Sequence, residues 1–329
     1  MMNDTSIPEF ILLGFPELQK FRFLLFVVFL TAYLFTFFGN ALIIGISHLD
    51  VGLHTPMYFF LSNFSLLEMC YISVTVPRLL ASLVMGSHAI SFWTCITQMY
   101  FFFFFGTTEF FLLATMAYDR YLAICHPLQY PVLMDSYACV YLALGSWLSG
   151  FLTPFLPTTF ISQLSFNSSN QINHFFCDTG PLIKLATSNT FMADMMVFLV
   201  SAVVVLVSLL LTVTSYGLIV STICRIPSAS GRHKAFSTCA SHFVVVTIFY
   251  GTVIFMYICP RSDQSSDMDK VVSVFYAVIT PMLNPIIYTL RNKDVKKALE
   301  KALKRVKNGC LKHRGKTLLT VLTGTSTLT

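Results

Sequence analysis

Charged residues are scarce in this sequence. Only 11% of its 329 residues are Asp, Glu, Lys or Arg, about half the share in an average soluble globular protein. So few charges cannot cover the surface of a water-soluble fold. A disordered chain is excluded as well, because 55% of the residues are hydrophobic and 33 Phe and 14 Tyr are present.

Basic residues are few along most of the chain, despite the net charge of +6. The segment from Arg291 to Lys316 contains 11 of the 21 Lys and Arg residues. The positive charge therefore belongs to a C-terminal tail and does not indicate a nucleic-acid partner.

Charge is almost absent from windows of about 20 apolar residues, the helix length that a bilayer core requires. These windows predict an all-α membrane protein with one bundle of seven transmembrane helices. The predicted spans are Phe23 to Ser47, Met57 to Leu83, Phe92 to Ile124, Ala138 to Ile161, Phe191 to Cys224, Lys234 to Ile258 and Met268 to Leu290. We expect an N-terminal segment at 1–22, a membrane domain at 23–290 and, at 291–329, a short amphipathic helix and a tail.

Orientation depends on where the basic residues lie. With the N-terminus outside, the inner side has 15 Lys and Arg and the outer side 6, but without the tail the loops alone give 4 against 6. No basic segment precedes the first apolar run and no small-residue cleavage site follows it, so we expect the first span itself to direct insertion.

Two glycosylation sequons agree with an external N-terminus. They begin at Asn3 and at Asn167 in the loop after the fourth span, whereas a third, at Asn63, lies inside the second span. Such short motifs also arise by chance, so glycosylation of Asn3 and Asn167 is an expectation.

Five motifs carry a family resemblance. The segment 116–125 reads MAYDRYLAIC and is followed by HPLQY, 53–62 reads LHTPMYFFLS, 234–242 reads KAFSTCASH, 281–288 reads PMLNPIIY, and Gly39-Asn40 lies in the first span. Together they resemble the signature of odorant receptors among the rhodopsin-like G protein-coupled receptors. Ser215-Tyr216 in the fifth span also fits.

The resemblance implies a receptor in the plasma membrane, not an enzyme. It would bind small hydrophobic volatile ligands and activate a stimulatory, olfactory-type heterotrimeric G protein to raise cyclic AMP. On activation the sixth span would swing outward, and Arg120 would leave Asp119 to meet the Tyr216 and Tyr288 hydroxyls. The expected switch residues are Asp119, Arg120, Tyr121, Tyr216, Asn284, Pro285 and Tyr288.

Glu68 and Glu109 are carboxylates within apolar spans. Each would cost a few kcal/mol there if charged and unpaired, so they require a cation, a proton or each other. The matching family positions resemble a sodium site with Asn284 close by, although Asp is commoner than Glu at the Glu68 position. Two protonated, hydrogen-bonded acids are the alternative.

Cys95 and Cys177 match the family's disulfide between the third span and the following long loop. The bond would hold that loop over the mouth of the pocket. His174, Cys177 and Asp178 could alternatively serve as metal ligands, but a disulfide removes the thiolate that a metal needs.

A run of aromatic residues from Tyr100 to Phe105 indicates where a ligand binds. With Glu109 and Arg120 defining the inward side of the third span, helical spacing directs Phe102 and Gly106 toward the bundle axis. The expected lining is Phe102, Phe103, Gly106 and Thr107, then Val200, Val203 and Val204, then Tyr250, Val253, Ile254 and Tyr257, and finally Val274 and Ala277. Tyr250 stands where many rhodopsin-like receptors outside this family have Trp. Alternatively, the aromatic run simply faces lipid.

A secondary transporter is the main alternative from another class, with Glu68 and Glu109 as an ion relay. Transporters usually contain internal repeats and paired broken helices, and neither is evident in this sequence. A chemoreceptor of the same fold in another tissue cannot be separated from an odorant receptor by sequence.

Overall fold

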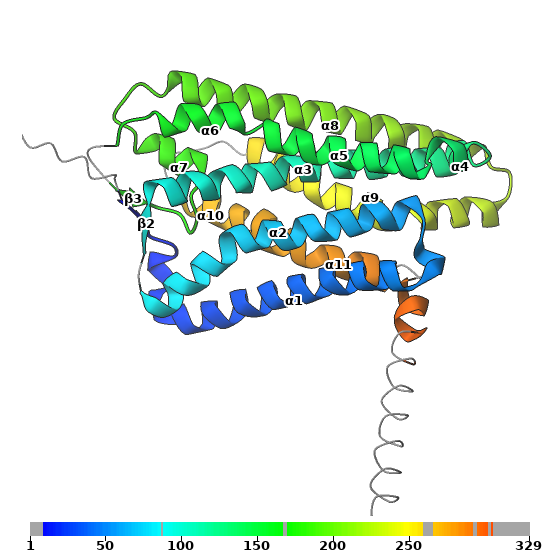
Figure 1. Cartoon of the computed structure of the whole chain (residues 1–329), viewed down its shortest axis with the longest axis horizontal. Coiled ribbons are helices and arrows are strands. Elements are labelled where there is room, and N and C mark those ends of the chain that lie inside the picture. The colour runs from blue at the N-terminus through cyan, green and yellow to red at the C-terminus, as the bar shows by residue number, and fades with distance from the viewer. Residues whose placement is uncertain are drawn as a thin grey trace, which may run out of the picture.

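The structure is a computed structural model of the chain, and it describes residues 9–86, 88–166, 170–258, 266–291, 295–301 and 304. Its long helices lie side by side along the longest axis of the molecule (Figure 1). They are α1 (Arg22–Leu49), α2 (Pro56–Met85), α3 (Phe92–Cys125), α5 (Ser136–Leu152) continued by α6 (Phe155–Ser162), α8 (Phe191–Arg225) and α9 (Ala229–Ile258). The last span combines α10 (Ser266–Val274), the π-helical turn η3 (Phe275–Ile279) and α11 (Thr280–Arg291).

Short elements occupy the ends of the bundle. The short helices are η1 (Pro16–Phe21), η2 (Val51–Leu53), α4 (Tyr130–Leu133) and α7 (Thr179–Lys184), and the strands are β1 (Glu9–Leu12), β2 (Ala89–Ser91) and β3 (Gln171–Ile172). The strands and α7 lie at one end, which we call the disulfide end, and α4 lies at the opposite end, which we call the Arg120 end (Figure 1).

The predicted spans agree with the helices. Six helical segments among the described residues are long and apolar enough to cross a membrane, and a shorter apolar stretch, Cys239–Val253, lies within α9. The helix boundaries differ from the predicted spans by a few residues, with the largest shift at α9, which begins at Ala229 rather than Lys234. Large apolar side chains remain exposed on the outer faces, among them Phe23 at 76% and Leu210 at 68%, as expected for helices that face hydrocarbon.

Local chemistry sets the helix ends. Pro56 occupies the first turn of α2, where a missing N–H costs nothing. Gly86 ends the same helix with φ of 66°, a left-handed conformation that favours glycine. At α5, Asp135 Oδ1 accepts a hydrogen bond from the Ala138 amide at 2.8 Å and so caps the helix.

Two glycines allow helices to approach closely. A Cβ built on Gly150 of α5 would lie 1.9 Å from Thr108 Oγ1 on α3, and one on Gly39 of α1 would lie 3.1 Å from Pro285 Cβ on α11. Glycine is therefore required where α5 packs on α3 and favoured where α1 packs on α11. Helix α3 also contacts α2, α8 and α9, which places it at the centre of the bundle.

A three-stranded sheet covers the disulfide end, and the sequence did not predict it. Its order is β2-β1-β3, with β1 antiparallel to β2 and parallel to β3. Phe10 of β1 is fully buried, which stabilises this arrangement by about 1.5–3 kcal/mol. Residues 9–12 are therefore packed into the fold.

The helix expected after the seventh span is partly described. Residues 295–301 are helical, with Val295 and Ala298 buried and Lys296 and Lys297 exposed. This separation of apolar and basic faces fits an amphipathic helix on a membrane surface. Lys301 Nζ lies 3.2 Å from Asp50 Oδ2, which ties this helix to the segment after α1.

Candidate functional site

Arg120 lies near the end of α3 in a buried polar cluster. Its Nε donates to Asp119 Oδ2 at 3.0 Å, and its terminal nitrogen donates to the same oxygen. The Tyr130 hydroxyl donates to Asp119 Oδ1 at 2.7 Å. Burial, followed by the nearby Asp119 carboxylate, raises the pKa of Tyr130, so the phenol stays protonated and remains a donor. Asp119 is therefore bound on both oxygens, and it holds Arg120 in place.

Tyr216 makes no hydrogen bond to Arg120 in the described part of the chain and is bound to another residue. Its hydroxyl lies 2.7 Å from His242 Nδ1, and the two rings stack with centroids 5.9 Å apart. This bond joins α8 to α9 inside the Arg120 end. His242 was not predicted from the sequence as a site residue. Its place at the end of the 234–242 motif, on the inner turns of the sixth span, could have identified it.

Tyr288 on α11 is buried and its hydroxyl has no hydrogen-bond partner among the described residues. Its ring contacts Phe64 edge-on at 6.3 Å. One turn earlier, Pro285 removes a backbone donor from α11 and packs against Gly39. An unsatisfied buried hydroxyl is costly, so a hydrogen-bond partner for Tyr288 would be stabilising.

Tyr121 lies apart from this cluster. Its hydroxyl is 3.0 Å from His126 Nε2, just beyond the end of α3. The structure therefore brings together Asp119 and Arg120, with Tyr130 as an additional member, and places Tyr121 on a different face of the helix.

The two buried acids lie in the middle of the bundle. Glu68 and Glu109 are 0% and 4% exposed. The Asn284 amide donates to Glu68 Oε1, which connects α2 to α11. Glu68 Oε2 and Glu109 Oε1 are buried without a hydrogen-bond partner among the described residues, as is Ser65 Oγ one turn before Glu68.

These atoms fit a hard cation. Sodium, like other hard cations, is bound by carboxylate, hydroxyl and amide oxygens, and the unpartnered oxygens of Glu68, Glu109 and Ser65 are of that kind. Two buried carboxyl groups with one amide partner between them cannot both stay ionised without a bound cation. A proton on each acid would satisfy the same requirement. Within the described residues, no group of three or more His, Cys, Asp or Glu side chains is placed to hold a metal ion.

The predicted disulfide is present. Cys95 and Cys177 are bonded, with Cα atoms 5.4 Å apart and a sequence separation of 82. The Cys177 amide also donates to Gln98 Oε1 at 3.0 Å, and Gln98 Nε2 donates to the Val74 carbonyl at 2.9 Å. The loop is thus fixed to α3 and α2. Cys177 has no thiolate for a metal, and His174 Nε2 instead lies 3.1 Å from Ser273 Oγ.

The predicted ligand region contains an aromatic cluster. The Phe102 ring lies 5.0 Å from Tyr71, 4.7 Å from Phe176 and 5.8 Å from Tyr276. Gly106 lies beside this cluster, since a Cβ at that position would be 3.9 Å from Tyr71 Cε2. Tyr71, Phe176 and Tyr276 were missed in the sequence. Tyr71 follows Glu68 by three residues, a spacing that places both on one helix face.

The remaining predicted lining residues are not all brought together. Val204, Ala277 and Thr107 are buried, and Phe103, Val200, Val253 and Val274 are half-buried. Val203 is 60% exposed on the outer face of α8, so its placement toward the bundle was wrong. Adjacent residues on a helix point about 100° apart, and here Val204 faces the bundle while Val203 lies beyond the edge of that face.

Tyr250 is buried between α8 and α3. Its hydroxyl lies 3.5 Å from Thr212 Oγ1, and its ring meets Phe110 edge-on at 5.6 Å. The side chains of Ile254 and Tyr257 lie outside the described residues, as do Asn3 and Asn167 with their sequons.

Comparison with known proteins gives a consistent result over nearly the whole chain. The family model described as "Olfactory receptor" matches residues 29–306. The chain is 51% identical to olfactory receptor 11L1 of Homo sapiens, over 92% of this chain and 94% of that protein. It is 52% identical to olfactory receptor 6B9 of Mus musculus, over 92% and 96%, and 51% identical to olfactory receptor 6F1 of Homo sapiens, over 92% and 98%. The matched region includes the Arg120 cluster, the buried acids and the disulfide.

Proposed function

Because the chain belongs to the olfactory receptor family and is therefore an odorant-sensing, multi-pass G protein-coupled receptor, we propose that it binds small hydrophobic volatile molecules and activates a stimulatory heterotrimeric G protein. Activation raises cyclic AMP in the cell. The protein is a receptor and not an enzyme. The observation that carries the proposal is the buried pair of Arg120 and Asp119 at the end of α3.

The signalling step is an exchange of partners by Arg120. In the resting arrangement Asp119 holds the guanidinium, and His242 holds the Tyr216 hydroxyl. When α9 moves outward, the bond between Tyr216 and His242 breaks. Arg120 then leaves Asp119 and meets the hydroxyls of Tyr216 and Tyr288. Arginine suits this role because it keeps its charge and donates in several directions.

The ligand binds beside Gly106, under the loop that the disulfide holds. Phe102 and Tyr71 supply an apolar wall, and Thr107 supplies a hydroxyl. Such a lining suits a small hydrophobic molecule with one polar group. Tyr250 couples occupancy to α9, because its hydroxyl reaches Thr212 of α8 and its ring contacts α3.

Glu68, Glu109 and Asn284 form a sodium site in the resting receptor. A bound cation supplies the charge that two buried carboxylates lack. The hydrogen bond from Asn284 to Glu68 and the unpartnered oxygens of both acids support this assignment. Protonation of both acids is the competing state, and sodium dependence distinguishes the two.

The disulfide end faces the extracellular side of the plasma membrane. Residues 1–22 then lie outside, with glycans on Asn3 and Asn167, and residues 291–329 lie in the cytoplasm. The support is the disulfide itself, which forms in oxidising compartments, and the basic tail, which the positive-inside rule assigns to the cytoplasm.

A cell assay tests the proposal. Cells expressing the wild-type chain or the Arg120→Ala variant, matched for surface level, are exposed to a panel of small hydrophobic volatiles while cyclic AMP is measured. The proposal expects a dose-dependent rise in the wild type alone. An equal rise in the Arg120→Ala cells would overturn the assignment of Arg120.

A further inference from the structure

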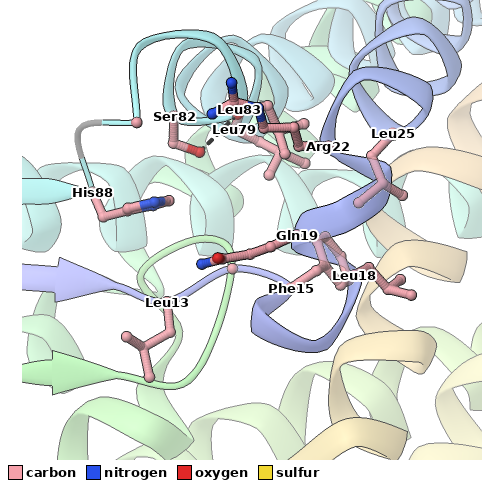
Figure 2. Close-up of a pocket in the computed structure, with 12 residues that line it drawn as sticks. Leu13, Phe15, Leu18, Gln19, Arg22, Leu25, Leu79, Ser82, Leu83 and His88 are labelled. Carbon is pink, nitrogen blue, oxygen red and sulfur yellow. Dashed lines mark hydrogen bonds between the residues drawn. The ribbon is translucent and has the colours of Figure 1, made fainter.

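A cavity at the disulfide end lies away from the proposed odorant site. It has a volume of about 320 Å³, which is within the range of small-molecule sites. Its lining comes from the N-terminal segment, η1, the start of α1 and the end of α2 (Figure 2). The lining residues are Leu13, Gly14, Phe15, Leu18, Gln19, Arg22, Leu25, Leu79, Ser82, Leu83, Gly86 and His88.

The cavity combines an apolar wall with polar groups. Figure 2 shows Leu79, Leu83 and Arg22 on one side of it and His88 on another, while Gln19 reaches toward its centre from the side of Phe15 and Leu18. Among the twelve lining residues that the structure describes, none is acidic. The cavity therefore offers positive charge and hydrogen-bond donors without a carboxylate of its own.

Two of these polar groups lack partners. His88 is half-buried, and its Nδ1 is buried without a hydrogen-bond partner in the described part of the chain. No hydrogen bond or ion pair joins Arg22 to another described side chain. A buried unpartnered ring nitrogen is costly, and an anionic group bound in the cavity would satisfy a protonated Nδ1.

The position of the cavity indicates that its ligand also has an apolar part. Arg22 is the first residue of α1, and Met85 is the last of α2, so the cavity lies where both spans leave the bilayer core. Exposed apolar side chains adjoin its lining residues in sequence, since Phe23, at 76%, follows Arg22 and Met85, at 70%, precedes Gly86. A ligand here has its head at the level of the lipid headgroups and its chain against Leu25, Leu79 and Leu83.

We propose that this cavity is a second binding site, for an acidic amphiphile with an acyl chain. Arg22 and His88 bind its carboxylate or phosphate, and the leucines of α1 and α2 contact its chain. The source of this chemistry is either a free fatty acid or the headgroup of an anionic lipid. The site is distinct from the odorant site beside Gly106, and binding there requires no G protein.

Photolabelling tests the site directly. The full-length receptor is reconstituted in phosphatidylcholine nanodiscs, labelled with a diazirine analogue of palmitic acid, and digested for mass spectrometry. The proposal expects saturable labelling of the segments around 13–25 and 79–88, which palmitic acid suppresses and palmityl alcohol does not. Labelling that maps to other segments, or that the alcohol suppresses equally, would overturn it.

Matched variants separate the cavity from the general surface charge. Arg22→Gln should weaken saturable labelling about tenfold, as expected from loss of one charge-assisted pair, and Leu83→Trp should abolish it by filling the cavity. Lys20→Gln removes a neighbouring charge outside the lining and should leave labelling unchanged. Equal labelling of the Arg22→Gln and wild-type proteins, each monodisperse by size-exclusion chromatography, would refute the assignment.

The lipid composition identifies the source of the ligand. If phosphatidylglycerol in the nanodisc suppresses labelling of the wild type, a lipid headgroup occupies the site. If it does not, a free fatty acid is the ligand. Either result upholds the site as long as labelling depends on Arg22. Since odorant response is not measured, failure of the proposed signalling function would leave this result intact.

Discussion

If the hydrogen bond between Tyr216 and His242 restrains α9 in the resting receptor, as we propose, its loss should raise signalling without ligand. The substitution His242→Phe removes the ring nitrogen that lies 2.7 Å from the Tyr216 hydroxyl and keeps a ring for the stack against Tyr216. A typical intramolecular hydrogen bond contributes about 0.5–1.5 kcal/mol. If the active state lacks this bond, the active fraction should rise about 2- to 12-fold.

The assay is cyclic AMP without ligand, divided by the surface level measured on the same cells. Tyr141→Phe is the matched control for an aromatic substitution, because Tyr141 is 71% exposed on α5 and far from the cluster in sequence. It should leave basal cyclic AMP unchanged. Basal signalling in His242→Phe that equals or falls below the wild-type level would show that this bond does not restrain the resting state.

Three further substitutions test the packing, the pocket and the buried acids. Gly150→Ala should lower the thermal midpoint in detergent by several degrees, because its Cβ would collide with Thr108. The control Gly145→Ala should leave the midpoint equal or higher, because a Cβ there has nothing within 4 Å. Equal loss in both variants would refute the close contact. Gly106→Leu should shift or abolish the odorant dose-response curve while basal cyclic AMP stays constant, and an unchanged curve would move the pocket elsewhere. Sodium chloride should raise the thermal midpoint of the wild type above its value in choline chloride, but not that of Glu68→Gln; a midpoint independent of sodium in the wild type would favour protonated acids.

The spans were predictable because the bilayer imposes a length and a composition that any sequence must satisfy. The predicted span Phe92 to Ile124 matches α3 (Phe92–Cys125) to within one residue. Its start is well defined because Ser91 caps the helix there. The disulfide was predictable from the family resemblance alone. Both features depend on a local pattern or a motif, which can be recognised in a single sequence.

Features that depend on distant contacts were not predictable. Strand β1 pairs with segments about 80 and 160 residues away, and its four residues carry no periodic signal. The partner of Tyr216 depends on how α8 meets α9, which no single-helix pattern specifies. Val203 shows the same limit, because the sequence does not say which of two adjacent valines faces the bundle. The cavity beside Arg22 arises from four elements and has no motif.

We propose that the chain transmits ligand binding to a stimulatory G protein through Arg120. The most direct measurement uses purified receptor in nanodiscs with a purified stimulatory heterotrimer and follows nucleotide exchange as hydrophobic volatiles are added. We expect ligand-dependent nucleotide exchange with the wild type and none with Arg120→Ala at equal receptor concentration. Exchange that proceeds equally with Arg120→Ala, under the same ligand, would contradict it.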